Sequence, residues 1–268
     1  MLKEENFNLK NLSYEIAKNR SEKHHNLFHY TRYDALKCII QNRSLRLSRV
    51  DLLNDTVENN KIIDLWKNKV FVVCFTYHRY ESPFFWKMYS KGSNEGVRIS
   101  FSRDFLKDLT IHSDDKCATA PLKPCKRTEF NVPHSLQVNS KSWGIFDYTI
   151  LDVMYADRNQ KIGYDENTQG RIKYHEWDLE KETRLRVAVR PKFDEVKLNR
   201  RYQIEYIPPE NEYLYAKLPE ECLRSMTVTL SPVADDGLKE NIEQLLKDNN
   251  LIDFVKINTS SLHGEIKE

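Results

Sequence analysis

Val70-Phe-Val-Val-Cys-Phe-Thr76 is a continuous apolar run bounded by polar residues, and this chain has few such runs. A strand that is buried on both faces has this composition, whereas a strand with one wet face alternates apolar and polar residues. The run therefore predicts a central strand of a sheet. It also predicts that the Cys74 thiol is buried and chemically inert.

The segments around this run predict further strands and a few helices. Alternation and β-branched or aromatic content predict strands at residues 26–31, 44–48, 96–101, 148–155, 184–189, 204–207, 213–218, 226–230 and 253–257. Helical spacing predicts helices at residues 9–18, 36–40, 57–67 and 237–247, and another that begins at Ser82-Pro83. Because the strands outnumber the helices and do not alternate with them, the pattern favours an α+β fold over a doubly wound sheet.

No internal repeat and no low-complexity linker divides the 268 residues. We therefore expect a single domain over 1–268. In this interpretation residues 1–25 form a helical lead-in and residues 26–190 form the core. Residues 114–144 are a poorly specified excursion, and residues 191–268 add C-terminal strands and a helix that complete the fold.

The composition indicates a cytoplasmic protein. Apolar residues make up 40% and charged residues 31%, as in an ordinary globular protein. The net charge of +2 does not indicate a nucleic-acid or membrane partner. The N-terminus lacks the apolar core of a signal peptide, and no run approaches the roughly 20 apolar residues of a membrane span. The five cysteines are odd in number and form no C-x-x-C pair, so we expect reduced thiols and no structural metal.

Common catalytic motifs are missing from the sequence. It has seven glycines and contains no G-x-G-x-x-G, no G-x-x-x-x-G-K-[ST] and no G-x-S-x-G. These absences come close to excluding a Rossmann dinucleotide site and a P-loop, and they count against an α/β-hydrolase. The candidates that remain are polar residues at the ends of apolar strands.

His29-Tyr30-Thr31 ends the first predicted strand. A histidine there can offer a ring nitrogen to a ligand hydroxyl, and the neighbouring tyrosine and threonine can orient that ligand. The alternative is an edge-strand histidine that is hydrogen-bonded to backbone.

Glu180-Lys-Glu182 precedes another predicted strand. Residues two apart on an extended chain face the same side, so both carboxylates can share one cleft, where each raises the proton affinity of the other. The alternative is a solvated strand start, neutralised by Arg184 and Arg186.

Two further sets of side chains have the same two interpretations. Trp86 and Tyr89 lie three apart on one helix face, where Trp86 is expected in the core and Tyr89 is either core or ligand platform. Ser48 ends an alternating strand, and Asn54-Asp55 with Glu58 is ordinary turn chemistry.

Taken in order, these motifs resemble a large, mostly uncharacterised bacterial domain family. That family carries a pattern like F-H-Y-T … L-R-L-S … L-N-D-x-x-E … C-F-S … W-x-x-Y … G-V … E-x-E-W-R. The resemblance covers about residues 27–189, with a weaker match at 226–257. The chain departs from the pattern at Thr76, where serine is usual, and at Thr183, where an aromatic residue is usual.

The motif order of that family is similar to ADP-ribosyltransferases of the His-Tyr-Glu type. The resemblance implies split mixed or antiparallel β-sheets flanked by helices, with NAD bound as a substrate. His29 would bind the nicotinamide ribose, Tyr89 (or Tyr80 as a weaker match) would stack on the nicotinamide, and Glu182 would be catalytic. The implied pocket also includes Tyr30, Thr31, Ser48, Thr76 and Glu180.

The activity implied is cleavage of NAD and transfer of ADP-ribose to a protein, RNA or DNA acceptor. Such stand-alone domains are often toxins or anti-phage effectors, which implies an antitoxin or immunity partner. A local basic surface for nucleic acid, or simply solvated loops, would account for Arg98, Arg103, Lys123, Lys126 and Arg127. Two alternatives stay open: a catalytically silent sensing or interaction module on the same fold, and a nuclease whose metal is held by Asp55, Glu58 and Glu182.

Overall fold

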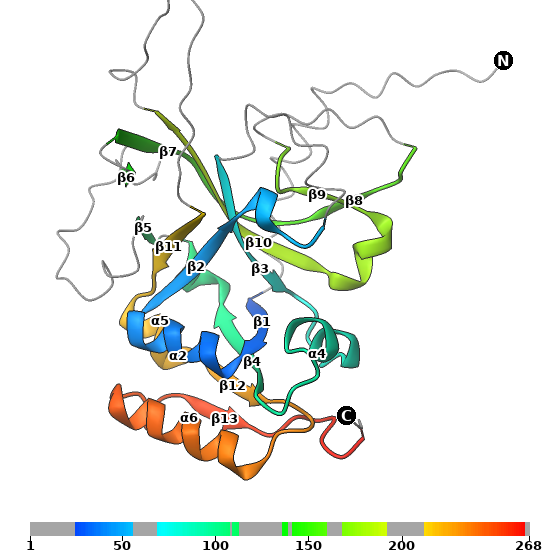
Figure 1. The fold of residues 1–268 in the computed structure, drawn as a ribbon, viewed down its shortest axis with the longest axis vertical. Helices are drawn as coiled ribbons and strands as arrows, with labels where there is room; N and C mark the ends of the chain where they lie inside the picture. The colour runs from blue at the N-terminus through cyan, green and yellow to red at the C-terminus, as the bar shows by residue number, and fades with distance from the viewer. Residues whose placement is uncertain are drawn as a thin grey trace, which may run out of the picture.

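The computed structural model describes residues 25–55, 69–107, 109–112, 136–138, 141–159, 168–191 and 212–265. In this part of the chain, eleven strands form one mixed, largely antiparallel sheet, and two more form a small parallel ladder (Figure 1). A few helices flank the sheet. The α+β class predicted from the sequence is confirmed.

The elements follow the chain in this order. The large sheet contains β1 (Asn26–Arg32), β2 (Ser44–Arg49), β3 (Val70–Thr76), β4 (Gly96–Ser102), β5 (Thr110–His112), β6 (Leu136–Val138), β7 (Lys141–Asp152), β10 (Glu182–Pro191), β11 (Tyr213–Lys217), β12 (Thr227–Leu230) and β13 (Lys256–Asn258). The small ladder contains β8 (Met154–Ala156) and β9 (Ile172–Tyr174). The α-helices are α2 (Tyr33–Asn42), α4 (Pro83–Tyr89), α5 (Glu220–Ser225) and α6 (Asp236–Asp248), and the short 3-10 turns are η1 (Val50–Leu52), η2 (Arg103–Leu106) and η4 (His175–Glu180).

Strand β3 lies at the centre of the sheet and is buried on both faces, as its apolar run predicted, except that Cys74 is only partly buried. Phe71, Val73 and Phe75 belong to the main core, whereas Val70 and Val72 pack in a second cluster on the opposite face. Strand β10 pairs with the whole of β3, from Glu182↔Thr76 to Ala188↔Val70. The alternation of side chains along an extended strand explains the two clusters.

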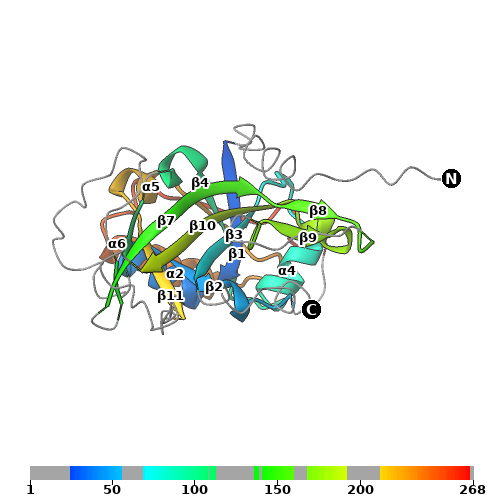
Figure 2. The same ribbon diagram turned by 90° about the horizontal axis from the view of Figure 1, so that it is seen from above.

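The sheet divides along the other edge of β3. Among the described residues, β1 pairs with β3 at Phe28↔Thr76 alone, and β2 pairs with it at Ser48↔Val72 and Arg49↔Phe71. Strand β1 instead pairs along its whole length with β4. Residues 73–75 therefore have no ladder partner on this edge among the described strands. Figure 2 shows β1 running at a steep angle to β7 and β10.

The main core joins the two parts of the sheet. It combines side chains from β1, β4 and β12 with others from β3, β10 and β11, and it is completed by α2, α5 and α6. Helix α2 contributes Leu36, Ile39 and Ile40 at helical spacing. The two parts of the sheet therefore share one core.

The predicted elements are mostly found, with shifted ends. The strand predicted over 148–155 is interrupted at Val153 and belongs to β7 and β8. The strand predicted over 253–257 is β13, which begins three residues later and ends one residue later. Helix α4 begins at Pro83 with Ser82 in the capping position, but the Ser82 side chain makes no capping hydrogen bond. The expected elements at 9–18, 57–67 and 204–207 lie outside the described residues, as does most of the excursion at 114–144.

Four described elements of the sheets and α-helices have no counterpart in the sequence prediction, namely β5, β6, β9 and α5. Each is too short to show a period of its own. Every described helix is too short or too polar to cross a lipid bilayer.

Candidate functional site

A cavity of about 80 Å³ lies beside the point where β1 and β3 separate. This volume is well above the roughly 10–15 Å³ that a single water requires. Aromatic side chains and two carboxylates surround it. Its lining residues are Phe28, His29, Tyr30, Cys74, Phe75, Thr76, Phe85, Tyr89, Glu180 and Glu182.

The His29 ring bridges the gap between the two strands. Its Nδ1 lies 2.8 Å from the backbone oxygen of Cys74, on the edge of β3 that lacks a ladder partner. A carbonyl oxygen only accepts, so Nδ1 carries the proton. Burial lowers the pKa of His29, and the bond to Cys74 opposes this only in part. The ring is therefore neutral near neutral pH, and its Nε2 is a hydrogen-bond acceptor.

The backbone-bonded histidine considered from the sequence is thus confirmed for Nδ1. This bond uses only one of the two ring nitrogens, and His29 also lines the cavity. The imidazole is held in one orientation by Cys74, and the other nitrogen stays able to accept from a ligand hydroxyl.

Helix α4 supplies one aromatic wall. Phe85 stacks on Tyr30 with ring centroids 5.1 Å apart and on Tyr89 with centroids 5.8 Å apart. Trp86 packs edge-on against Tyr30 and is 3% exposed, so its predicted place in the core is confirmed. Tyr89, three residues later, lines the cavity. The wall is rigid because each ring is held by its neighbours.

The two carboxylates enter from η4 and β10. Glu180 ends η4 and Glu182 begins β10, while Lys181 between them adopts a left-handed conformation with φ 44°. The Tyr89 hydroxyl donates a hydrogen bond to Glu180. The Lys173 ammonium lies 2.6 Å from Glu180 Oε2 and 3.0 Å from Glu182 Oε2.

Glu182 is held from a second side by Arg184. The Arg184 Nε donates to Glu182 Oε1 at 2.7 Å, and a terminal guanidinium nitrogen reaches Oε2 at 3.3 Å. The Tyr155 hydroxyl accepts the backbone N–H of Glu182 at 2.9 Å. The carboxylate is therefore fixed in one rotamer by two cations.

These contacts separate the proton affinities of the two glutamates. Burial raises the pKa of Glu180, although Lys173 opposes it. Burial also acts to raise the pKa of Glu182, but Arg184 and Lys173 overcome it and hold the value at about 2. Two neighbouring carboxylates with different pKa values can take different roles in one reaction.

The structure brings together most of the residues proposed from the sequence. Among the lining residues are His29, Tyr30, Thr76, Tyr89, Glu180 and Glu182. The Thr76 hydroxyl is engaged in the local turn: it donates to the Lys181 carbonyl at 3.3 Å and accepts from the His78 backbone N–H at 3.0 Å. This is backbone support rather than a free ligand group.

Three other proposed residues lie elsewhere. Thr31 is on β1 opposite Val97, and Ser48 is on β2 opposite Val72 and Tyr213; neither lines the cavity. Tyr80, the weaker match for the middle tyrosine, is 71% exposed and does not line it either. Tyr89 is therefore the tyrosine that this geometry favours.

The suggested basic surface is wrong for two of its members. Arg98 is buried, with its guanidinium 3.7 Å from the centre of the Phe28 ring, and Arg103 is buried against Asp152. The other three basic residues, at 123, 126 and 127, lie outside the described residues. No surface for nucleic acid can be built from Arg98 and Arg103.

The residues proposed for the alternative metal site are not brought together either. Asp55 is buried but does not line the cavity that contains Glu182, and Glu58 lies outside the described residues. Within the described ranges, no three His, Cys, Asp or Glu side chains converge on a common point suited to a metal ion.

The sequence interpretation missed Lys173 and Tyr155. Lys173 lies on a three-residue strand in a segment without periodicity, and no motif marked it. The alternative for the glutamates was right about Arg184, which pairs with Glu182, but wrong about Arg186, which pairs with Asp147. It was also wrong about solvent, since Glu182 is 4% exposed.

Comparison with known proteins finds no matching protein-family model, no similar curated protein and no similar solved structure.

Proposed function

We propose that this chain is an ADP-ribosyltransferase-like enzyme that cleaves NAD and transfers ADP-ribose to a macromolecular acceptor. The observation that carries the proposal is the convergence of His29, Tyr89 and Glu182 on one cavity, from β1, α4 and β10. These residues are far apart in the sequence. Each offers the chemical group that its place in the motif order implies.

The aromatic wall suits the nicotinamide ring of NAD. The ring is flat and carries a positive charge, and aromatic faces bind both properties. Tyr89 and Phe85 present stacked rings to the cavity. A volume of about 80 Å³ admits a small planar group, whereas sites for larger ligands measure roughly 300–1,000 Å³. The adenosine half of NAD would therefore lie outside this cavity.

His29 suits the ribose next to that ring. Its neutral Nε2 can accept a hydrogen bond from a ribose hydroxyl, and the bond from Nδ1 to Cys74 keeps the ring from turning away. A neutral imidazole also does not repel the positive charge of the substrate.

The carboxylates suit the bond that breaks. When the nicotinamide–ribose bond lengthens, positive charge develops on the ribose, and a fixed carboxylate stabilises it. Glu182 has a pKa of about 2 and is therefore ionised throughout the neutral range. Glu180, whose pKa burial raises, is the better of the two for taking a proton from the attacking acceptor.

Glu182→Gln is expected to lower nicotinamide release on the order of 10²–10³-fold, because glutamine keeps the shape but loses the charge. Glu180→Gln is expected to impair transfer more than release. The assay follows NAD labelled in its adenylate half, with protein, RNA and DNA acceptors from cell lysate, and measures nicotinamide in parallel.

Glu176→Gln is the matched control, because Glu176 lies in η4, as Glu180 does, but pairs at the surface with Arg158. It should retain wild-type release. Circular dichroism checks that each variant is folded. Equal release from folded wild type and folded Glu182→Gln would refute the catalytic role.

A silent binding module on the same fold is the second candidate, and one observation favours it. Both oxygens of Glu182 already accept hydrogen bonds, from Arg184 and from Lys173. A carboxylate whose two oxygens are both bonded to cations of the protein has a structural role whether or not it is catalytic. Calorimetric binding of NAD by wild type, with no nicotinamide release from any acceptor mixture, would select this candidate over the enzyme.

A further inference from the structure

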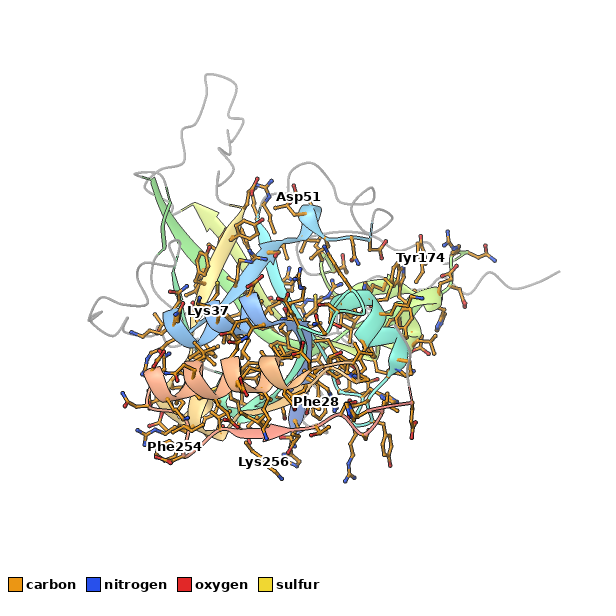
Figure 3. The ribbon with its side chains drawn as sticks, turned by 60° about the horizontal axis from the view of Figure 1, so that its bottom comes forward. Phe28, Lys37, Asp51, Tyr174, Phe254 and Lys256 are labelled. Carbon is orange, nitrogen blue, oxygen red and sulfur yellow. The ribbon has the colours of Figure 1, made fainter. Side chains whose placement is uncertain are left out.

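The small ladder of β8 and β9 delivers two side chains to the carboxylates. Tyr155 on β8 and Lys173 on β9 are register partners in this ladder. Tyr155 contacts the backbone of Glu182, and Lys173 contacts both glutamates. Figure 1 shows the ladder beside the start of β10, and Figure 3 shows Tyr174, which follows Lys173, on the α4 side of the molecule.

Lys173 is the cation that connects the pair. Its ammonium lies 2.6 Å from Glu180 Oε2 and 3.0 Å from Glu182 Oε2, and its side chain is 5% exposed. It also lies 4.8 Å from the centre of the Trp177 ring, which covers it. The Lys173 ammonium is therefore largely shielded from water.

The charges at this site balance only if Lys173 is counted. Two carboxylates that share one cation are close enough to repel each other, and repulsion between buried like charges drives one of them to take up a proton. Arg184 contacts Glu182, whereas Lys173 contacts both. Among the described residues, the charged and titratable groups around the pair are His29, Cys74, Tyr89, Tyr155, Lys173 and Arg184, together with Asp55, Arg158 and Glu176, which line a second pocket with Glu180.

We propose that Lys173 is a positioning residue: its ammonium holds Glu180 and Glu182 in place and keeps both charged at the cavity wall. Its catalytic meaning rests on the function proposed above. The charge arrangement itself is a property of the free protein and is measurable without any substrate.

Removing the Lys173 ammonium should raise the pKa of both glutamates. Burial already raises the pKa of Glu180, and Lys173 is the first of the opposing influences. Without Lys173 the pKa of Glu180 rises further, and that of Glu182 rises as well, since Arg184 remains its main counter-charge. Glu180 would then be protonated over part of the range in which the wild type is ionised.

The test is a carbon-13 NMR titration of glutamate side chains in the full chain. Glu180→Gln and Glu182→Gln assign the two resonances. Lys173→Met and Lys173→Gln are expected to raise the proton affinity of Glu180 at least about tenfold, which is one pH unit. Lys173→Arg should keep it close to wild type. Lys107→Met is the matched control, because Lys107 pairs with Asp104 at the exposed surface.

Unchanged midpoints in a folded Lys173→Met or Lys173→Gln variant would overturn the proposal. If neither variant folds, each is combined with Glu180→Gln and Glu182→Gln. Recovery of folding supports the proposal, because the uncompensated charges were then the cause. Continued unfolding shows that Lys173 acts through packing, and overturns it.

The activity arm separates this inference from the proposed function. If wild type releases nicotinamide, the acid limb of its pH–rate profile should move to higher pH in Lys173→Met and return in Lys173→Arg. A purely structural loss would lower the rate at every pH without moving the limb. If wild type releases no nicotinamide, the proposed function fails, and the titration still decides the role of Lys173.

Discussion

Arg184→Met should lower the free energy of unfolding by about 3–5 kcal/mol, the usual cost of removing one partner from a buried ion pair. The Arg184 side chain is 0% exposed, and its Nε lies 2.7 Å from Glu182 Oε1. Methionine keeps most of the apolar stem but removes the guanidinium. The cost arises because Glu182 stays buried with only part of its counter-charge.

The proton affinity of Glu182 gives an independent magnitude. Its pKa of about 2 in the folded protein lies below the ordinary value of 4.5. That lowering, which Arg184 and Lys173 produce together against burial, corresponds to about 3 kcal/mol. Because the folded pKa is the lower one, this stability is present above pH 4.5 and is lost as the pH falls from there toward 2. The difference between wild type and Arg184→Met should therefore be largest near neutral pH and shrink in acid.

Urea unfolding followed by tryptophan fluorescence measures this difference across the pH range. Arg158→Met is the matched control, since Arg158 pairs with Glu176 at an exposed site and its loss should leave the unfolding midpoint unchanged. Arg184→Met combined with Glu182→Gln should lose less than Arg184→Met alone, because the stranded anion is gone. A loss below about 1 kcal/mol for Arg184→Met, or a loss that does not vary with pH, would refute the reasoning.

Two further predictions concern the walls of the cavity. Glu81 accepts hydrogen bonds from Trp86 Nε1 at 3.1 Å and from the Ser260 hydroxyl at 2.6 Å, so it ties α4 to the C-terminal segment. Glu81→Gln should cost about 1 kcal/mol and speed amide exchange in α4; unaltered exchange there would contradict this tie. Cys74 should react with a thiol reagent much more slowly than exposed Cys38, because burial raises the pKa of the Cys74 thiol well above its usual value. Equal labelling rates in the native protein would contradict it.

The sequence predicted the meeting of His29 and Glu182 for a reason that the sheet makes plain. Strands β1 and β10 both border β3, and Phe28, Thr76 and Glu182 lie in one row across the three strands. A long apolar run such as β3 marks the centre of a sheet. Polar residues at the ends of its neighbours are therefore close together even when the chain between them is long.

The same reasoning could not exclude Thr31. It lies two residues from His29 and so shares its face of β1. By that point β1 has left β3 and pairs with β4, with Thr31 opposite Val97. The divergence depends on tertiary packing of the core, and no local pattern in residues 26–32 encodes it.

Four buried charges meet beside this cavity, and their stability alone does not account for them. Glu180, Glu182, Lys173 and Arg184 are each at most 6% exposed. Buried ion pairs repay their desolvation poorly, and well-packed apolar side chains of similar volume are often as stable or more so. Perturbed carboxylates at a cavity wall are, by contrast, common where an enzyme stabilises or transfers charge. The two candidate functions therefore make separate predictions for a variant without these four charges. If the site is catalytic, replacing all four charges by apolar side chains should give a protein that is at least as stable and has no nicotinamide release. If it is a silent module with a structural ion network, the same replacement should leave NAD binding in place, as calorimetry would measure it.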